Sequence, residues 1–275
     1  MRMKEIRGAI RGAGLGLLLV LGGGLAAHAQ NPDELMPAAS AAKAKDILQQ
    51  ATNALGGAAY LNVHNSDCTG RLAQFEHSGA LGGYTQFHSY HEMPDKARME
   101  YDPLGKIVDL YAGKEGWSLD RSGVSDLPAS SIADYQEQLQ TDMNTILRFR
   151  MNDPSLVFRY DGREVVDLKV ADWVEVGDHD GHTLRIAIDQ KGHLPLRTVL
   201  SQRDKLTGEK METGALFSSY HMIDGIQTPF QVVRTRNDQP VSQVFYESCH
   251  YDADLPANLF TRVSLDQRFA KEKKK

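Results

Sequence analysis

The side chains best suited to bind a metal ion or to move protons gather in two short stretches. The stretch 178–182 (DHDGH) holds four of them in five residues, and His88 and His91 lie three residues apart. An Asp-Gly pair is typical of a hairpin turn, where successive side chains diverge. On a strand, residues three apart face opposite sides of the sheet. We therefore predict a turn and ordinary strand positions here, and no metal site.

Catalytic motifs are missing from the sequence. It contains no Gly-x-Ser-x-Gly elbow, no Gly-rich phosphate loop and no His-Glu-x-x-His motif. The paired carboxylates Asp161 and Glu164 flank a predicted turn, where solvent would surround them. The sequence therefore predicts no catalytic residue, no cofactor and no enzyme. A hydrolase assembled only in space stays open as an alternative.

Large apolar side chains are the stronger candidates for a binding site. Most lie in or beside predicted strands, and two lie on a predicted helix. Core filling accounts for most single aromatic residues, but in a sheet curved around a hollow the core and the hollow share one face. Rings on that face can enclose most of an apolar ligand. The candidates are Phe87, Tyr101, Tyr111, Trp117, Leu139, Met143, Phe158, Trp173 and Phe230.

Two cysteines, Cys68 and Cys249, lie near opposite ends of the chain. In an exported protein they could form a disulfide if the first and last strands meet. The sequence leaves a disulfide and two separate thiols equally open. Neither cysteine has a second ligand at metal-binding spacing.

Most of the chain reads as short strands separated by turns. The clearest alternation is Leu184, Ile186 and Ile188 against polar neighbours, which predicts an antiparallel sheet with one covered face. Two similar phrases, DQKGHLPL and DGIQTPF, predict hairpins followed by strands that Pro195 and Pro229 begin. The predicted strands are 84–91, 96–101, 106–111, 156–160, 164–170, 173–177, 182–188, 196–203, 211–222, 229–236 and 241–251.

Two helices are predicted beside these strands. Residues 40–55 carry a narrow apolar stripe, with Ser40 as the cap and Gly56-Gly57 as the end. Its small side chains would let it lie close to a sheet. Residues 131–149 carry a second, larger stripe that includes Leu139 and Met143. The fold class is therefore α+β, mostly β.

The ends of the chain differ from its middle. Residues 1–29 have a basic start, a short apolar centre and an Ala27-His28-Ala29 cleavage site, which predicts a signal peptide cleaved after Ala29 and export. A membrane anchor is the alternative, but the apolar run is too short to span a bilayer. We expect a flexible leader at 30–39, a single domain at 40–262 and a charged tail at 263–275. The net charge of −5 argues against nucleic acid as a partner.

Several phrases in order resemble the periplasmic lipoprotein-carrier superfamily, the LolA/LolB-like proteins. The resemblance covers roughly residues 40–260 and is that of a divergent member. It implies an incomplete, curved antiparallel β-barrel with helices covering the open mouth. The phrases are MPDKAR at 93–98, PLG at 103–105, YAGKEGW at 111–117, GHLP at 192–195, DGIQTP at 224–229 and LPANLF at 255–260.

The resemblance implies a periplasmic carrier that holds an acyl-chain-bearing ligand, a lipoprotein or lipid, as in outer-membrane lipoprotein sorting. It also implies a monomer with an inner- or outer-membrane delivery partner. Where family members usually carry a basic residue that holds the lid, this chain has Met93, which puts that latch in doubt. The alternative is an interaction or envelope-stress sensor module with the same fold and a filled cavity. A hydrolase would need a nucleophile or a carboxylate pair at the cavity rim.

Overall fold

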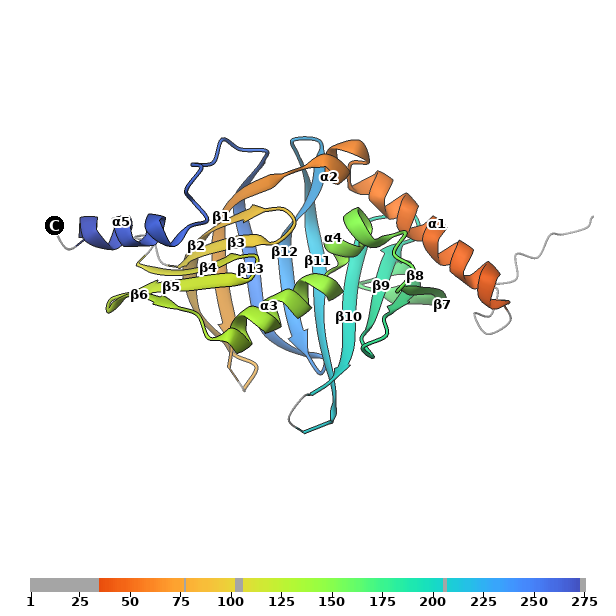
Figure 1. The fold of residues 1–275 in the computed structure, drawn as a ribbon. Helices are drawn as coiled ribbons and strands as arrows, with labels where there is room; N and C mark the ends of the chain where they lie inside the picture. Colours follow the sequence, from red (N-terminus) through yellow and green to blue (C-terminus); the bar gives the residue numbers. More distant parts are fainter. Residues whose placement is uncertain (1–34, 77, 102–105, 205–206, 273–275) are drawn as a thin grey trace, which may run out of the picture. The chain divides into compact units, whose positions relative to one another are not determined.

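Thirteen strands form one antiparallel sheet in the computed structural model, which describes residues 35–76, 78–101, 106–204 and 207–272 (Figure 1). The predicted signal peptide, the start of the leader and the turn at 103–105 lie outside these residues. The strand order is β6-β5-β4-β3-β2-β1-β13-β12-β11-β10-β9-β8-β7. The strands are β1 (Asn65–Phe75), β2 (Leu81–Glu92), β3 (Lys96–Tyr101), β4 (Ile107–Ala112), β5 (Glu115–Asp120), β6 (Gly123–Asp126), β7 (Val157–Val166), β8 (Lys169–Gly177), β9 (Thr183–Asp189), β10 (Pro195–Arg203), β11 (Lys210–Ile223), β12 (Ile226–Arg236) and β13 (Gln239–Tyr251).

The sheet does not close, because β6 and β7 are its two unpaired ends. This confirms the predicted fold class, an antiparallel incomplete barrel with helices. The first and last strands pair with each other, and Cys68 lies directly opposite Cys249. The two sulfurs form a disulfide. The question that the sequence left open is therefore settled by the β1–β13 pairing.

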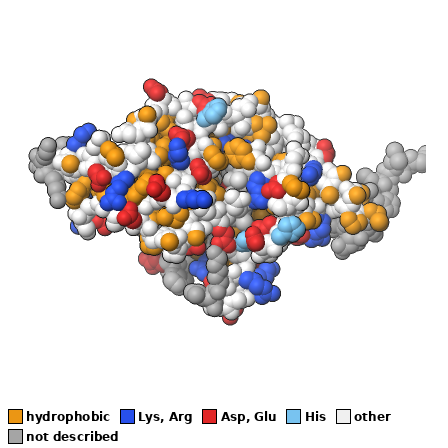
Figure 2. Space-filling model, viewed as in Figure 1, with side chains coloured by type: hydrophobic (Ala, Val, Ile, Leu, Met, Phe, Trp, Pro, Cys, Tyr) orange, Lys and Arg blue, Asp and Glu red, His pale blue; other side chains and the backbone are white. Residues whose placement is uncertain are grey.

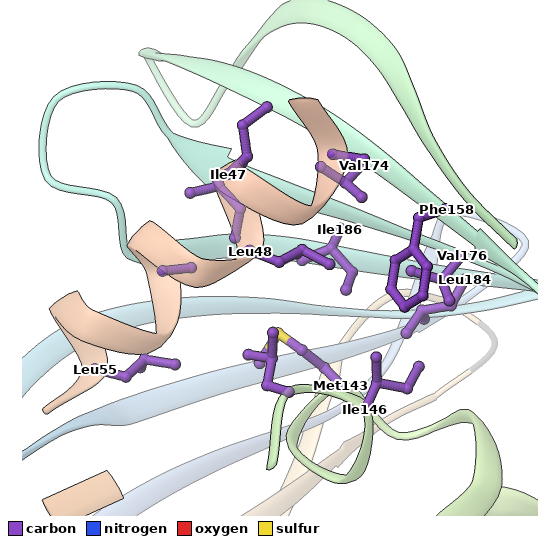
Figure 3. Packing of buried hydrophobic residues seen from close by; sticks show 14 of the residues in the cluster. Ile47, Leu48, Leu55, Met143, Ile146, Phe158, Val174, Val176, Leu184 and Ile186 are labelled. Carbon is purple, nitrogen blue, oxygen red and sulfur yellow. The ribbon is translucent and has the colours of Figure 1, made fainter. Parts of the chain in front are cut away.

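Helix α1 (Pro37–Leu55) covers the β7–β9 end of the sheet. Ala44, Leu48 and Ala51 are fully buried, and the alanines let the helix lie close to the strands. Figure 3 shows Ile47 and Leu48 pointing toward Val174 and Ile186. This end of the sheet is therefore a filled core.

The ends of α1 differ in part from the prediction. Pro37 begins the helix, as proline often does. Ser40 is buried one turn inside, and its hydroxyl oxygen accepts a bond from the Tyr160 backbone N–H. The predicted Ser40 cap is thus wrong. Gly56 ends the helix with a φ of +136°, as predicted, and the short helix α2 (Ala58–Asn62) follows.

The second predicted helix is interrupted. Helix α3 (Ala129–Thr141) ends where Asp142 adopts an extended conformation. The Asp142 side chain accepts a bond from the Thr145 N–H and so begins α4 (Met143–Thr145). A π-helical turn, η2 (Ile146–Arg150), completes the segment. One continuous helix at 131–149 was therefore wrong.

The hairpin predictions hold in most places. Pro195 begins β10, and Asp224-Gly225 forms the β11–β12 turn. Pro229 instead lies inside β12. The β12–β13 ladder begins only at Gln231, so the missing N–H of Pro229 interrupts no hydrogen bond between β12 and β13. The predicted strand 164–170 is a hairpin that turns at Asp167-Leu168. Strands β1, β5 and β6 were not in the predicted set.

Helix α5 (Arg262–Glu272) occupies most of the predicted charged tail. Leu265 is fully buried against Val108, Leu110 and Leu119, which share the sheet face opposite α1. Buried Arg98 of β3 donates to the Leu259 carbonyl oxygen. The folded part of the chain therefore extends beyond residue 262. Among the described residues, none of the helices has both the length and the apolar character needed to span a membrane.

Candidate functional site

A cavity of ≈ 1160 Å³ lies between the sheet and the α3–η2 segment. It exceeds the roughly 300–1,000 Å³ of most small-molecule pockets. Strands β1, β2 and β9 to β13 supply its floor, and α3, α4 and η2 supply the opposite wall. Its apolar lining comes from Leu55, Leu139, Met143, Leu184, Leu200, Phe217, Ile226, Val232 and Val244. Such a surface favours long apolar groups.

Several titratable groups line the cavity, and burial favours the neutral form of a histidine and of several tyrosines among them. Burial, together with the positive charge of Arg234, lowers the pKa of His91 to about 4. Burial raises the pKa of Tyr60, Tyr251 and Asp142 above their ordinary values. At neutral pH these histidine and tyrosine side chains carry no charge.

Helix α3 crosses in front of the central strands and covers the cavity (Figure 1). Thr141 is its only buried residue, so the helix packs loosely. One attachment is to the β4–β5 hairpin: the Tyr135 ring stacks on Tyr111 with centroids 4.3 Å apart, and the Gln136 side chain donates to the Gly113 carbonyl oxygen at 2.6 Å. These contacts hold α3 beside one end of the sheet.

A second attachment ties α3 to the β8–β9 turn through His182. Its Nε2 lies 2.9 Å from a Glu137 carboxylate oxygen and its Nδ1 2.8 Å from Asp178. We call Glu137, His182 and Asp178 the lid latch. Desolvation lowers the pKa of His182, but the bonds and charges of the two carboxylates outweigh it, so the pKa is raised. The two carboxylates therefore favour the protonated imidazole, whose two N–H groups can donate to Asp178 and Glu137.

In the structure, side chains of the 178–182 stretch and of His88 contact other residues. Asp178, Asp180 and His182 lie close enough together to share an ion, but both ring nitrogens of His182 already contact carboxylates. The stretch forms a turn, as predicted. His88 contacts Asp67, while His91 lines the cavity on the other face of β2. The opposite orientation of the two histidines is confirmed.

Met93, which stands where the resemblance expects a basic residue, lines the cavity. Its backbone N–H donates to the His64 carbonyl oxygen. The lid is instead held by Glu137 and Gln136, from the side of the helix. The attachments of α3 through Tyr135, Gln136 and Glu137 therefore do not use position 93.

Only two of the nine candidate cavity residues, Leu139 and Met143, line the cavity. The ladders place Phe87, Tyr101 and Tyr111 on the cavity face of the sheet, but none of the three lines the cavity. Phe87 packs beneath Val232 and Val244, and Tyr111 lies under Tyr135. For these residues the predicted place in the cavity lining was wrong.

The remaining four candidates lie elsewhere. Phe158 is part of the core under α1, because that helix fills the β7–β9 end. Trp117 packs beside α5, and Trp173 lies in a separate cluster on the face away from α1. Phe230 packs against His221, with ring centroids 4.6 Å apart. None of the four is part of the cavity lining.

Polar lining residues were the main omission of the sequence analysis. Tyr60, Arg148, Thr228 and Tyr251 line the cavity together with the Cys68–Cys249 disulfide. Arg148 lies on η2, within a segment whose apolar spacing concealed the break at Asp142. Figure 2 shows charged and hydrophobic side chains intermixed on the face that carries α3.

No protein-family model matches the sequence, and no curated protein sequence matches it significantly. Solved structures do match the fold. A DUF1329 family protein from Desulfovibrio piger aligns with a TM-score of 0.59 at 16% identity, covering 82% of this chain and 99% of that one.

Two further structures agree. A LolA superfamily protein from Nitrosomonas europaea aligns with a TM-score of 0.52 at 16% identity, over 81% of this chain and 99% of that one. A domain from Vibrio parahaemolyticus, provisionally assigned to outer-membrane lipoprotein sorting, aligns with a TM-score of 0.55 at 13% identity, over 82% and 99%. The chain thus has the fold of the LolA superfamily, which is consistent with a divergent member.

Proposed function

We propose that this protein is a carrier that holds an acyl-chain-bearing ligand, a lipid or lipoprotein, in the cavity beneath α3. The observation that carries the proposal is the size and lining of that cavity: ≈ 1160 Å³ with an apolar floor and a loosely packed covering helix. Each acyl methylene moved from water into such a site contributes roughly 0.8 kcal/mol. A chain of many methylenes would therefore bind tightly.

The alternative of a docking module with a filled interior receives less support. In such a module, side chains should fill the space between the sheet and the helices, as they do beneath α1. Beneath α3 the space is open instead. We further propose export to the periplasm, based on the sequence of residues 1–29, and transfer of the ligand to a membrane partner without chemical change.

The test is extraction of the purified full-length gene product after expression with its own N-terminal segment. Organic extraction and mass spectrometry should recover an acyl lipid in near-equal molar amount. Ala215 lines the cavity from β11, so Ala215→Trp should fill it and abolish the recovered lipid. Ala133→Trp places the same ring on an exposed position of α3 as the matched control. A blank from the wild type, also after incubation with envelope lipids, would refute the proposal.

A further inference from the structure

Arg148 is a cationic side chain for which the described residues provide no ion pair. Arg148 lies on η2 and lines the cavity. Its Nε and Nη1 atoms are buried and have no hydrogen-bond partner among the described residues. Buried donors almost always have partners, and a guanidinium can only donate. These two N–H groups therefore lack an acceptor in the described part of the chain.

The surroundings fix Arg148 in place. Ile146 and Leu147, immediately before it, are each 2% exposed and pack in the core beneath α1. The guanidinium carbon lies 4.5 Å from the centre of the Tyr60 ring. The Tyr60 hydroxyl in turn donates to the Asn144 side chain at 2.9 Å. Arg148 is therefore held on an aromatic face, with two of its three nitrogens lacking a partner among the described residues.

Carboxylates near Arg148 do not neutralise it. Among the described residues no acidic side chain forms an ion pair with Arg148, whereas Arg98 and Arg150 pair with Glu100 and Asp153. The nearest acidic lining residue on the same segment, Asp142, uses its side chain to begin α4. Burying an unpaired charge is costly, so an anion bound at Arg148 would offset that cost.

We infer that the acyl ligand carries an anionic head, a carboxylate or phosphate, which the Arg148 fork binds while the chain lies along the apolar floor. The inference rests on the proposed function and narrows its ligand class. A guanidinium matches either head with two parallel bonds. Leu139, Met143 and Leu200 line the same cavity and would contact the chain. A neutral acylglyceryl group would leave Arg148 unpaired.

The test compares matched pairs of ligands that differ only in charge. Binding of palmitate and hexadecanol, and of dipalmitoyl phosphatidic acid and dipalmitoylglycerol, is measured by displacement of a fluorescent lipid probe at pH 8. The anionic member should bind about 10- to 100-fold more tightly to the wild type. The ligand pair with the larger difference in affinity identifies the preferred head as a carboxylate or a phosphate.

Variants separate recognition from structure. Arg148→Met should abolish the preference for the anionic member, while Arg262→Met, which removes the same charge at an exposed ion pair on α5, should keep it. Because the buried charge is unpaired, ligand-free Arg148→Met should melt no lower than the wild type. A lower melting temperature together with an unchanged preference would assign Arg148 a structural role and overturn the inference.

Two outcomes separate this inference from the proposed function. Equal binding of charged and neutral members by the wild type would overturn the anionic head and leave the carrier standing. Failure of all four lipids to displace the probe, with no lipid recovered by extraction, would overturn both.

Discussion

The lid latch offers the sharpest test of how α3 is held over the cavity. His182→Ala removes the imidazole between Glu137 and Asp178, and Glu137→Ala removes its partner on α3. The double variant completes a cycle that isolates the Glu137–His182 coupling from other contacts of either residue. The perturbation acts on the lid and leaves the apolar floor of the cavity unchanged.

The expected magnitude follows from burial and geometry. The His182 and Glu137 side chains are 15% and 27% exposed and lie 2.9 Å apart. Exposed ion pairs contribute roughly 0.2–1 kcal/mol, and hydrogen bonds to charged groups roughly 1.5–3 kcal/mol. This pair lies nearer the second range, so we expect a coupling of about 1.5 kcal/mol. That corresponds to about a tenfold change in the ratio of attached to detached α3.

Hydrogen exchange of the α3 amides at pH 6 measures this ratio directly. Both single variants should speed exchange across residues 133–141 by about tenfold, and the double variant should add little. Asp238→Ala, which breaks the exposed Arg197–Asp238 pair, is the control and should leave α3 unchanged. Unaltered α3 exchange in both latch variants would refute the latch.

The latch should also weaken as the pH rises. Because its two carboxylates raise the pKa of His182, the attachment is strongest below the ordinary histidine value of about 6.5 and is lost as pH rises through the raised pKa. Bonds from His182 outweigh desolvation and lower the pKa of Asp178, so this carboxylate stays charged to a lower pH than an ordinary aspartate. After correction for intrinsic exchange, α3 protection should fall above neutrality in the wild type. His182→Ala should show no such step.

The remaining predictions concern the frame that carries the lid. Replacing Cys68 and Cys249 by Ala opens a loop of 181 residues and should lower the free energy of unfolding by at most about 5 kcal/mol; an unchanged denaturation midpoint would show that the bond contributes nothing. Leu265→Ala should cost about 2–5 kcal/mol in the same assay, since the side chain is fully buried, and a cost under about 0.5 kcal/mol would mean that α5 is not part of the fold. Gly56→Ala would place a Cβ in steric overlap with the Gly225 carbonyl oxygen of the β11–β12 turn and should reduce the melting temperature more than Gly208→Ala, whose Cβ would meet no neighbour; equal shifts would contradict the close approach.

The strands were predictable wherever one face of the strand is buried and the other is exposed to solvent. Strand β3 matches its prediction at both ends, and Leu184, Ile186 and Ile188 lie on one buried face. The break at Asp142 could not be predicted, because Met143 and Ile146 continue the apolar spacing of the helix before it. The basic end of the chain likewise concealed α5, although Leu265 and Phe269, four residues apart, pack in one cluster.

The binding site was less predictable than the sheet. An inward-facing aromatic side chain can be part of the core or of the cavity lining, depending on which helix lies above it. Phe158 lies beneath α1, and Tyr111 lies beneath Tyr135 of α3. Sequence spacing does not carry that information. The latch shows the same limit, since the turn at 178–182 was expected but its partner Glu137 lies 45 residues earlier in the chain.

The strand order has a consequence for how this protein would respond to a protease. Strands β6 and β7 are the two far ends of the sheet yet follow each other in the chain, so residues 127–156 act as a strap between them. A single proteolytic cut in α3 would produce two fragments that remain associated in the folded protein. The two pieces would stay joined by the β1–β13 ladder and by the Cys68–Cys249 bond, and would separate only when unfolded and reduced. The strap is thus a long connection that can be cut while the sheet remains whole.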